Sequence, residues 1–261
     1  MPEILEVESY RLLAERVVGA TIARGWADAY LGKKLTSPAA WNRVVRGLTV
    51  TETRRRGKML MLETDGPTLG LRFGMTGVLL LDGAAGIEGL FYGPHLFDEK
   101  WLRGGLEFTD GRKLIVHDPR RMARVEVNPD LNQLGPDALT LTRRQFEDVV
   151  AVERGEGPAI KARLLDQSHV AGVGNLLADE MLYRAGVDPR TRIGLLNADE
   201  KDRIFRAFRQ TMNSLKRRGG SHLGDHMDAR FPGGLCPKDG GAMLIGTVGG
   251  RTTYWCSLHQ R

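Results

Sequence analysis

The chain begins Met1-Pro2-Glu3, and these residues could carry out covalent chemistry. Removal of Met1 would leave the nitrogen of Pro2 as a free secondary amine, which can attack an aldehyde-like carbon. The product would be an iminium ion with no N–H proton to lose, so it would stay positive and draw electrons from the neighbouring carbon. An apolar pattern from Val7 to Val18 predicts a helix over residues 3–18, whose positive end would favour the neutral, reactive amine. The alternative is an ordinary helix start, with proline in the first turn and acids after it.

The composition indicates a globular protein with a polyanionic partner. The chain has 261 residues, 41% of them hydrophobic, which suits one large or two modest domains. It has no apolar run near the ~18 residues of a membrane span and no charged-then-apolar leader. We therefore expect a soluble, cytoplasmic protein with no membrane partner. Lys and Arg number 38 against 32 acids, with clusters at residues 54–58, 120–124 and 216–218. Together they favour nucleic acid as the partner, although any one could be solvated surface.

The pattern over residues 20–125 predicts β-strands separated by turns. Thr109-Asp110-Gly111 predicts a hairpin between strands at 106–108 and 113–116. The other predicted strands are 58–63, 77–81 and 124–127. The pattern changes near residue 130, after which helices are predicted at 143–154, 159–166, 175–185 and 199–217. The glycine-rich last 40 residues, which hold Cys236 and Cys256, predict a small hairpin module.

A glycine-rich segment, residues 167–175, separates two of the predicted helices. Gly172 and Gly174 let the backbone turn tightly and approach a ligand closely. The next helix should start at Asn175, whose side chain can cap it, and the backbone N–H groups there suit a DNA phosphate. Such a link between helices can also be purely structural.

Segments along nearly the whole chain resemble the formamidopyrimidine-DNA glycosylase and endonuclease VIII family. Residues 161–180, with Ala171-Gly172-Val173-Gly174-Asn175 at their centre, are similar to its helix–two-turns–helix motif. The other similar segments are 1–8 (its N-terminus), 55–58 (its lysine-bearing hairpin), 73–77 and 118–122 (its wedge loops) and 250–253 (the tip of its zinc hairpin). The resemblance implies an α+β multidomain fold: a catalytic N-terminal helix plus β-sandwich domain at 1–128, a helix–two-turns–helix DNA-binding domain at 135–220, and a zinc-finger-like C-terminal β-hairpin at 230–261.

The same resemblance implies a bifunctional DNA glycosylase and AP lyase of base excision repair. Pro2 would attack the sugar C1′ as a damaged base leaves, and the adjacent Glu3 would move protons to and from the sugar ring oxygen. The iminium makes the C2′ proton acidic, so the 3′ phosphate leaves by β-elimination and the 5′ phosphate can follow. Lys58 would hold the phosphate beside the reacting sugar, although without the resemblance it would read as an exposed turn lysine. Glu6, one turn after Glu3, would support the site or serve as a first-turn acid.

The implied partner is double-stranded DNA containing damaged bases or abasic sites, bound by a monomer at the nucleoid. The damaged base is flipped out of the helix, and side chains fill the gap. Met75, Arg120 and Met122 stand at the filling positions, with Met122 where the family usually has phenylalanine. Arg120 would donate to the orphaned base. Taken without the resemblance, either methionine would more often fill a core.

Lys161, Asn175 and Arg251 are the residues expected to hold backbone phosphates. From the tip of the C-terminal hairpin, Arg251 would bind the phosphates that flank the lesion.

The C-terminal hairpin departs from the family pattern of two Cys-x-x-Cys pairs. Its pairs are Cys236 with Asp239 and Cys256 with His259, and the two-residue spacing is kept on both sides. Thiolate, carboxylate and imidazole all bind zinc, so these residues predict one structural Zn²⁺. The alternative is a hairpin without metal, held by packing around Tyr254 and Trp255. The two cysteines could also form a disulfide, although a metal site is the favoured use.

Two features of the sequence favour different substrates. The wedge at 118–122 resembles the formamidopyrimidine branch, whereas residues 219–235 are shorter than the loop that closes over the flipped base in the 8-oxoguanine branch. We therefore predict that 8-oxoguanine is not the best substrate. A rival function is a non-catalytic binder of damaged or abasic DNA, which the presence of Pro2, Glu3 and Lys58 disfavours. A nucleic-acid-binding protein with no lesion preference would explain the charge but not the N-terminus.

Overall fold

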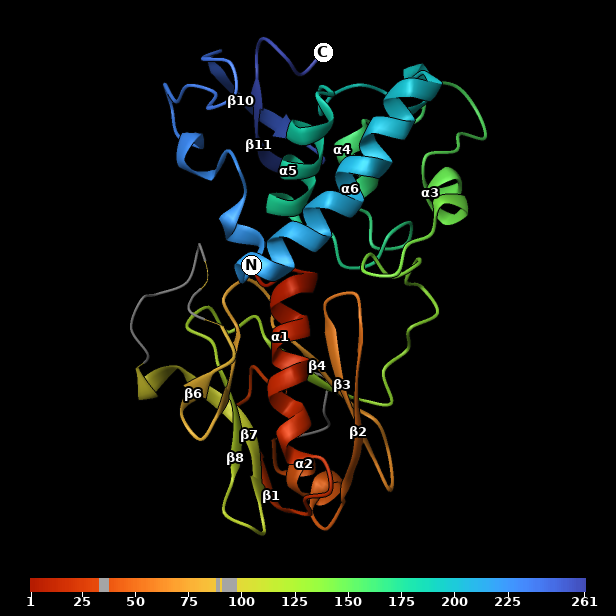
Figure 1. The fold of residues 1–261 in the computed structure, drawn as a ribbon. Coiled ribbons are helices and arrows are strands. Elements are labelled where there is room, and N and C mark those ends of the chain that lie inside the picture. Colours follow the sequence, from red (N-terminus) through yellow and green to blue (C-terminus); the bar gives the residue numbers. More distant parts are fainter. Residues whose placement is uncertain (33–37, 88–89, 91–97) are drawn as a thin grey trace. The chain divides into compact units, whose positions relative to one another are not determined.

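The computed structural model describes residues 1–32, 38–87, 90 and 98–261 (Figure 1). The chain divides into two units, Met1–Asn132 and Gln133–Arg261. The break lies close to the change of pattern predicted near residue 130. The finer division into domains at 1–128, 135–220 and 230–261 stays a prediction.

Antiparallel sheets form most of the first unit. One sheet has the strand order β1-β7-β8-β5-β6 and another the order β2-β3-β4-β9. The strands of the first sheet are β1 (Ile22–Ala27), β5 (Val78–Leu81), β6 (Ala84–Ala85), β7 (Leu102–Phe108) and β8 (Lys113–His117). Those of the second are β2 (Val50–Arg56), β3 (Met59–Thr64), β4 (Leu69–Arg72) and β9 (Arg124–Val127). Buried apolar residues of both sheets share one core, as in the predicted β-sandwich.

Two helices complete this unit. Helix α1 (Ile4–Ala14) buries Val7 and Tyr10 in the shared core and continues as a 3₁₀ turn to Val17, so the predicted helix is confirmed with a shorter regular part. Helix α2 (Pro38–Val45) lies in a region predicted to hold only strands. It packs on β1 because Gly25 has no side chain there: a Cβ at Gly25 would lie 2.3 Å from Val45 and 3.0 Å from Trp41.

The predicted hairpin around Thr109-Asp110-Gly111 is confirmed, since Leu106 pairs with Leu114 and Glu107 with Lys113. The other predicted strands appear as β3, β5 and β9, with ends shifted by a residue at most. The region also contains β1, β2, β4 and β6, which were not predicted individually.

The second unit is mainly helical. Its helices are α3 (Arg143–Val149), α4 (Ile160–Leu165), α5 (Asn175–Ala185) and α6 (Ala198–Arg218). All were predicted, although α3 ends earlier than expected. The predicted terminal hairpin is β10 (Met243–Val248) with β11 (Arg251–Cys256), and its cysteines share a small core with Tyr183 of α5. No helix in the described part of the chain is both long and apolar enough to cross a membrane.

Candidate active site and metal centre

A cavity of about 200 Å³ opens at the N-terminus of the first unit. Met1, Pro2 and Lys58 line it together with both segments that resemble wedge loops. The complete lining is Met1, Pro2, Lys58, Arg72, Phe73, Gly74, Met122 and Arg124. The structure thus brings the predicted nucleophile and phosphate ligand to one site. Arg72 and Arg124 were missed, because only strand pairing shows that they border this cavity.

Glu3 and Glu6 fix the start of α1 beside the cavity. The two form a capping box: the side chain of Glu3 accepts from the backbone N–H of Glu6, and Glu6 Oε2 accepts from the backbone N–H of Glu3 at 2.8 Å. Both side chains are buried. Glu6 therefore orients the helix start, and the carboxylate of Glu3 is held one residue from the nitrogen of Pro2.

The N-terminal amine is in an environment that favours its neutral form. The structure starts at Met1, so its free amine belongs to Met1 and the Pro2 nitrogen is an amide. Burial lowers the pKa of the Met1 amine from its usual 8.0, while Glu3 and Glu6 oppose this and Lys58 and Arg120 reinforce it. Removal of Met1 would place the Pro2 amine next to the same charged groups.

Lys58 occupies a two-residue turn between β2 and β3. Arg56 pairs with Met59 across the hairpin, which leaves Gly57 and Lys58 as the turn. Gly57 has a φ of +54°, which glycine adopts without strain. The tight turn directs Lys58 to the wall of the cavity.

Asp118 holds the two wedge loops together. Its buried carboxylate accepts from the hydroxyl of Thr76 in the first loop (2.5 Å) and from the backbone N–H of Met122 in the second (2.6 Å). It also accepts from the backbone N–H of Ala123, directly after the second loop (2.7 Å). Gly74 is equally constrained, because a Cβ there would lie 2.5 Å from Met122 Cβ. One buried anion therefore sets the shape of both loops.

The three predicted gap-filling residues lie on these two loops. Met122 is 42% exposed and Arg120 is exposed, while Met75 is half-buried. The exposure of Met122 argues against core filling and leaves its side chain available for DNA. Their roles as wedge residues stay predictions.

Lys161 is not placed as expected. Its side chain is fully buried, and its ammonium pairs with Asp179 Oδ1 at 2.7 Å and donates to Thr253 Oγ1 at 2.6 Å. The prediction that Lys161 binds a phosphate directly does not fit this burial, since the charge is already compensated inside the protein. Lys161 instead ties α4 to the tip of the terminal hairpin.

Asn175 contacts the hairpin tip that carries Arg251. Helix α5 starts at Asn175 as predicted, but the cap residue is Gly174, and Asn175 does not cap the helix. Its Nδ2 donates to the carbonyl of Thr252 at 3.0 Å. Arg251, the neighbour of Thr252, is exposed. Asn175 thus holds the segment that presents Arg251, and phosphate binding by both residues stays a prediction.

Buried acids at the centre of α5 anchor the segment before the hairpin. Asp179 pairs with Arg230 as well as Lys161, and Glu180 accepts from His226 Nδ1 at 2.7 Å. Burial alone would raise the pKa of Glu180, but the hydrogen bond from His226 and neighbouring positive charge lower it to about 2. Glu180 is therefore ionised at neutral pH. His226 thus contacts Glu180 inside the second unit.

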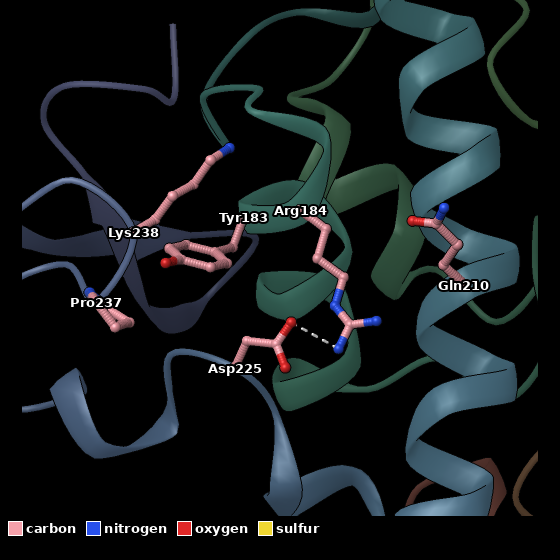
Figure 2. Close-up of a pocket in the computed structure, with 6 residues that line it drawn as sticks. All are labelled: Tyr183, Arg184, Gln210, Asp225, Pro237 and Lys238. Atoms are coloured by element: carbon pink, nitrogen blue, oxygen red, sulfur yellow. Dashed lines mark ion pairs between the residues drawn. The ribbon is translucent and has the colours of Figure 1, made fainter.

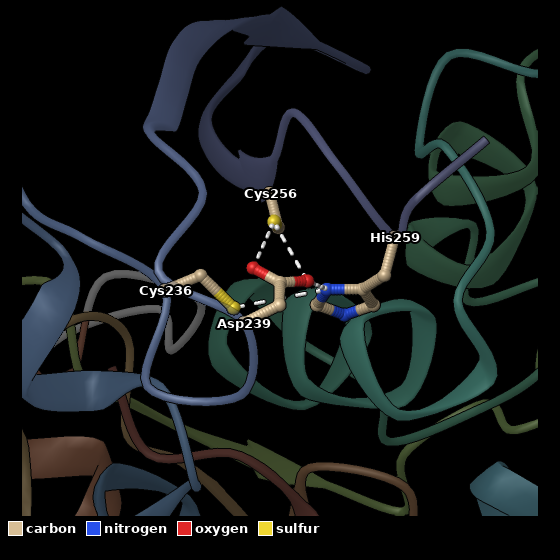
Figure 3. A group of neighbouring side chains, drawn as sticks. All are labelled: Cys236, Asp239, Cys256 and His259. Carbon is tan, nitrogen blue, oxygen red and sulfur yellow. Dashed lines mark hydrogen bonds and ion pairs between the residues drawn. The ribbon is translucent and has the colours of Figure 1, made fainter.

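Cys236, Asp239, Cys256 and His259 form one cluster, with their ligand atoms within 4.8 Å of one another (Figure 3). His259 Nε2 lies 3.1 Å from the backbone carbonyl of Tyr183, so it can donate there and leave Nδ1 as the ligand atom. A backbone hydrogen bond from Gly241 holds the pKa of Asp239 well below its usual range, so this carboxylate is ionised.

The surroundings of this cluster fit a metal ion. A Cβ at Gly241 would lie 2.8 Å from Cys256 Sγ and 3.0 Å from Asp239 Oδ1, so glycine keeps the space beside two ligand atoms open. Sulfur, nitrogen and carboxylate donors together suit a divalent cation such as zinc. The group can therefore hold a metal.

A larger cavity, of about 420 Å³, lies in the second unit (Figure 2). Tyr183, Arg184, Gln210, Asp225, Pro237 and Lys238 line it. Arg184 pairs with Asp225 at 2.9 Å and with Glu180 at 2.6 Å, which neutralises its charge within the protein. Among these lining residues there is no pairing of nucleophile and acid like that at the N-terminus. The chemistry therefore favours the smaller cavity.

The chain is similar to known proteins over its whole length. The family model for the formamidopyrimidine-DNA glycosylase N-terminal domain matches residues 1–125, and that for the formamidopyrimidine-DNA glycosylase H2TH domain matches residues 134–225. Formamidopyrimidine-DNA glycosylase of Paracoccus denitrificans is 31% identical over 288 residues, and that of Stenotrophomonas maltophilia is 31% identical over 287. Each alignment covers 100% of both chains.

Solved structures of Lactococcus lactis Fpg share the fold. Its complex with DNA containing an abasic site has a TM-score of 0.80 and 23% identity, covering 99% of each chain. Its complex with DNA containing an oxidised pyrimidine has a TM-score of 0.81 and 23% identity, covering 100% of each. At this identity the likeness establishes the fold, while the family models and sequence relatives establish the kinship. The chain belongs to the formamidopyrimidine-DNA glycosylase family.

Proposed function

We propose that this chain is a bifunctional DNA glycosylase and AP lyase of base excision repair, acting on double-stranded DNA through the amine of Pro2. Family membership supports the enzyme class. The observation that supports the residue roles is the N-terminal cavity, which collects Pro2, Lys58 and the wedge residue Met122 beside the buried Glu3. A non-catalytic DNA-binding protein would not need these residues gathered at one cavity. As a DNA repair enzyme it would work at the nucleoid.

In this proposal Pro2 attacks C1′ of the flipped nucleotide, and the electron pair of the glycosidic bond leaves with the damaged base. Glu3 donates a proton to the sugar ring oxygen as the ring opens, which allows the iminium to form. Loss of a C2′ proton then expels the 3′ phosphate, and a second elimination expels the 5′ phosphate. Lys58 offsets the charge of the phosphate beside the reacting sugar. Hydrolysis of the final iminium frees Pro2.

Met75, Arg120 and Met122 are proposed to fill the gap left by the flipped base. Met122 is a flexible thioether that can wedge between bases but stacks less well than an aromatic ring. Arg120, on the same loop, would donate to acceptor atoms of the unpaired base. Their shared support by Asp118 would place them together.

The lesion range is proposed to favour abasic sites, ring-opened purines and non-planar oxidised pyrimidines. The short segment 219–235 is pinned to α5, since Glu180 accepts from the backbone of Asp225 at 2.9 Å and Asp179 pairs with Arg230. A segment held in this way offers few contacts to a flipped base. Selection would therefore depend on how easily the lesion unstacks, and planar 8-oxoguanine stacks well.

Incision of matched duplexes tests the function and its lesion range together. Under single-turnover conditions, we expect rapid incision at an abasic site and at ring-opened guanine opposite cytosine, and incision at 8-oxoguanine at least about tenfold slower, an energy difference of about 1.4 kcal/mol. An undamaged duplex is the control. If the protein incises none of the lesions, the proposed enzymatic function is contradicted. If ring-opened guanine and 8-oxoguanine are incised at equal rates, only the proposed lesion range is contradicted.

The metal is proposed to be one structural Zn²⁺ held by Cys236, Asp239, Cys256 and His259. Zinc would stabilise the fold of the hairpin that presents Arg251, and it would take no part in the reaction. A carboxylate is an uncommon ligand in a closed structural site.

Elemental analysis should therefore find about one zinc per chain, as four ligands complete a tetrahedral site. Asp239→Ala should lose the metal, whereas Asp239→Cys should hold it more firmly against a chelator, because thiolate is the usual ligand in structural zinc sites. A metal-free protein with full affinity for DNA would contradict this proposal and leave a hairpin held by packing alone.

A further inference from the structure

A row of positive side chains crosses the sheet end that borders the N-terminal cavity. Lys58 immediately precedes β3, whose first residue, Met59, pairs with Arg72 of β4. Arg72 in turn pairs with Arg124 of β9. The order β3-β4-β9 makes these strands neighbours, so Lys58, Arg72 and Arg124 follow one another along the same edge of the cavity.

The pairing of Arg72 with Arg124 is unfavourable within the protein. Residues directly opposite each other in an antiparallel sheet place their side chains on the same face, where like charges destabilise the sheet. Glu126 offsets Arg72, since its Oε1 lies 3.1 Å from Arg72 Nε. Arg124 is exposed, and its side chain makes no ion pair with any residue in the described ranges. Its charge is therefore available for a ligand.

We propose that Arg124 binds a second DNA phosphate beside the one at Lys58, so that the cation row holds both phosphates flanking the reacting sugar. Adjacent strands are about 4.8 Å apart, so the backbones at Lys58 and Arg124 are separated by roughly 10 Å. This distance suits two successive anions better than one. A guanidinium can also grip a phosphate through two parallel hydrogen bonds.

The inference rests on the proposed function and adds to it. Both flanking phosphates become leaving groups when β-elimination is followed by δ-elimination. A cation on each would hold the sugar in the cavity through both steps and offset the charge that each departing phosphate carries. Arg124 is thus assigned as a binding residue of the reaction site, while Lys58 keeps its role at the first phosphate.

The test combines a side-chain change with removal of single phosphate charges. Binding of the full-length protein, freed of Met1, is measured for duplexes that contain an uncleavable tetrahydrofuran abasic analogue. The duplexes carry either normal phosphates or one neutral methylphosphonate immediately 5′ or 3′ to the analogue. The proteins are wild type, Arg124→Ala, Arg124→Lys and, as a matched control, Arg46→Ala; Arg46 is an exposed arginine just after α2 that does not line the cavity.

For wild type, one of the two methylphosphonates should weaken binding about tenfold through loss of the Arg124 contact, the usual scale for a hydrogen bond to a charged group. For Arg124→Ala, the same methylphosphonate should cost little, because the partner is already gone. The slope of log affinity against log salt should fall by about 0.9 in Arg124→Ala and stay unchanged in Arg124→Lys. The melting temperature of Arg124→Ala should not fall, since a like-charge pair is removed.

The outcomes separate the inference from the function. Two results would overturn the second phosphate site while wild type still incises abasic DNA. One is that the losses from Arg124→Ala and from each methylphosphonate are additive. The other is that the salt slope changes no more in Arg124→Ala than in Arg46→Ala. The proposed enzymatic function would be unaffected by either. A lower melting temperature with no coupling would assign Arg124 a structural role instead. Failure of wild type to incise abasic DNA would contradict the proposed function itself.

Discussion

Acetylation of the Pro2 amine is expected to reduce borohydride trapping of abasic-site DNA by more than about 10³-fold, the scale lost when a catalytic nucleophile is removed. An acetylated nitrogen is an amide and cannot form the iminium ion that borohydride reduces. The chain that retains Met1 should behave in the same way at Pro2, because its Pro2 nitrogen is also an amide. Mass spectrometry of the N-terminus identifies which form is present in each sample.

The acetylated protein needs a control for modified lysines, since Lys58 is part of the same site. Acetylation of Lys58→Arg, whose guanidinium the reagent does not modify, should abolish trapping all the same. Acetylation with an uncleavable abasic duplex bound, followed by removal of the DNA, should protect the cavity and preserve trapping. Pro2→Gly is a weaker test, because any N-terminal amine can react with an abasic aldehyde. Full lyase activity in a chain shown to be acetylated at Pro2 would eliminate the proposed nucleophile.

The rate of trapping should also depend on pH in a defined direction. Burial lowers the pKa of the Met1 amine. Pro2 is itself buried, so we expect burial to act in the same direction on its freed amine. A lowered pKa means that the neutral, reactive form predominates from a lower pH upwards. Trapping should therefore rise with pH and reach its plateau at a lower pH than trapping by an exposed N-terminal proline.

Local sequence patterns were sufficient for much of the fold and for the metal cluster. The spacing of Cys236 and Asp239 brings two ligands together within one turn, and Cys256 and His259 have the same spacing. Pairing of β10 with β11 then brings the two pairs of ligands together. The start of α5 at Asn175 followed from the glycines before it. Each of these features depends on residues close together in the chain.

The predictions failed where distant residues decide the structure. Lys161 has the sequence context of a phosphate ligand, but Asp179 and Thr253 compensate its charge in the interior. Helix α2 was missed because it is short, and its packing depends on the space left by Gly25 in β1. Arg124 was missed because only the register of β4 with β9 places it opposite Arg72.

Asp179→Ala is expected to destabilise the second unit by about 3–5 kcal/mol, because it leaves two buried cations without a counter-charge. Lys161 Nζ lies 2.7 Å from Asp179 Oδ1, and Arg230 pairs with the other oxygen; all three side chains are at most 2% exposed. Lys161 also holds Thr253, and Arg230 belongs to the segment before the hairpin, so both attachments of the hairpin region should loosen. The measurement is the free energy of unfolding in urea.

Asp202→Ala provides the matched control. Asp202 also pairs with two arginines, Arg143 and Arg206, but at the surface, where the loss should be about 1 kcal/mol or less. If Asp179→Ala does not fold, Asp179→Asn keeps the shape of the side chain and should still unfold at lower urea concentration than wild type. A loss for Asp179→Asn no greater than for Asp202→Ala would contradict the argument.

Replacing the whole buried set by apolar residues distinguishes a missing charge from missing packing. Lys161→Met, Asp179→Leu and Arg230→Met together should recover a large part of the stability lost in Asp179→Ala, since uncharged side chains of similar size need no partner. The recovered protein should nevertheless bind DNA less well than wild type, because Lys161 no longer donates to Thr253 beside Arg251. If stability and DNA affinity both return, the buried ions have no part in placing the hairpin tip, and packing alone positions Arg251.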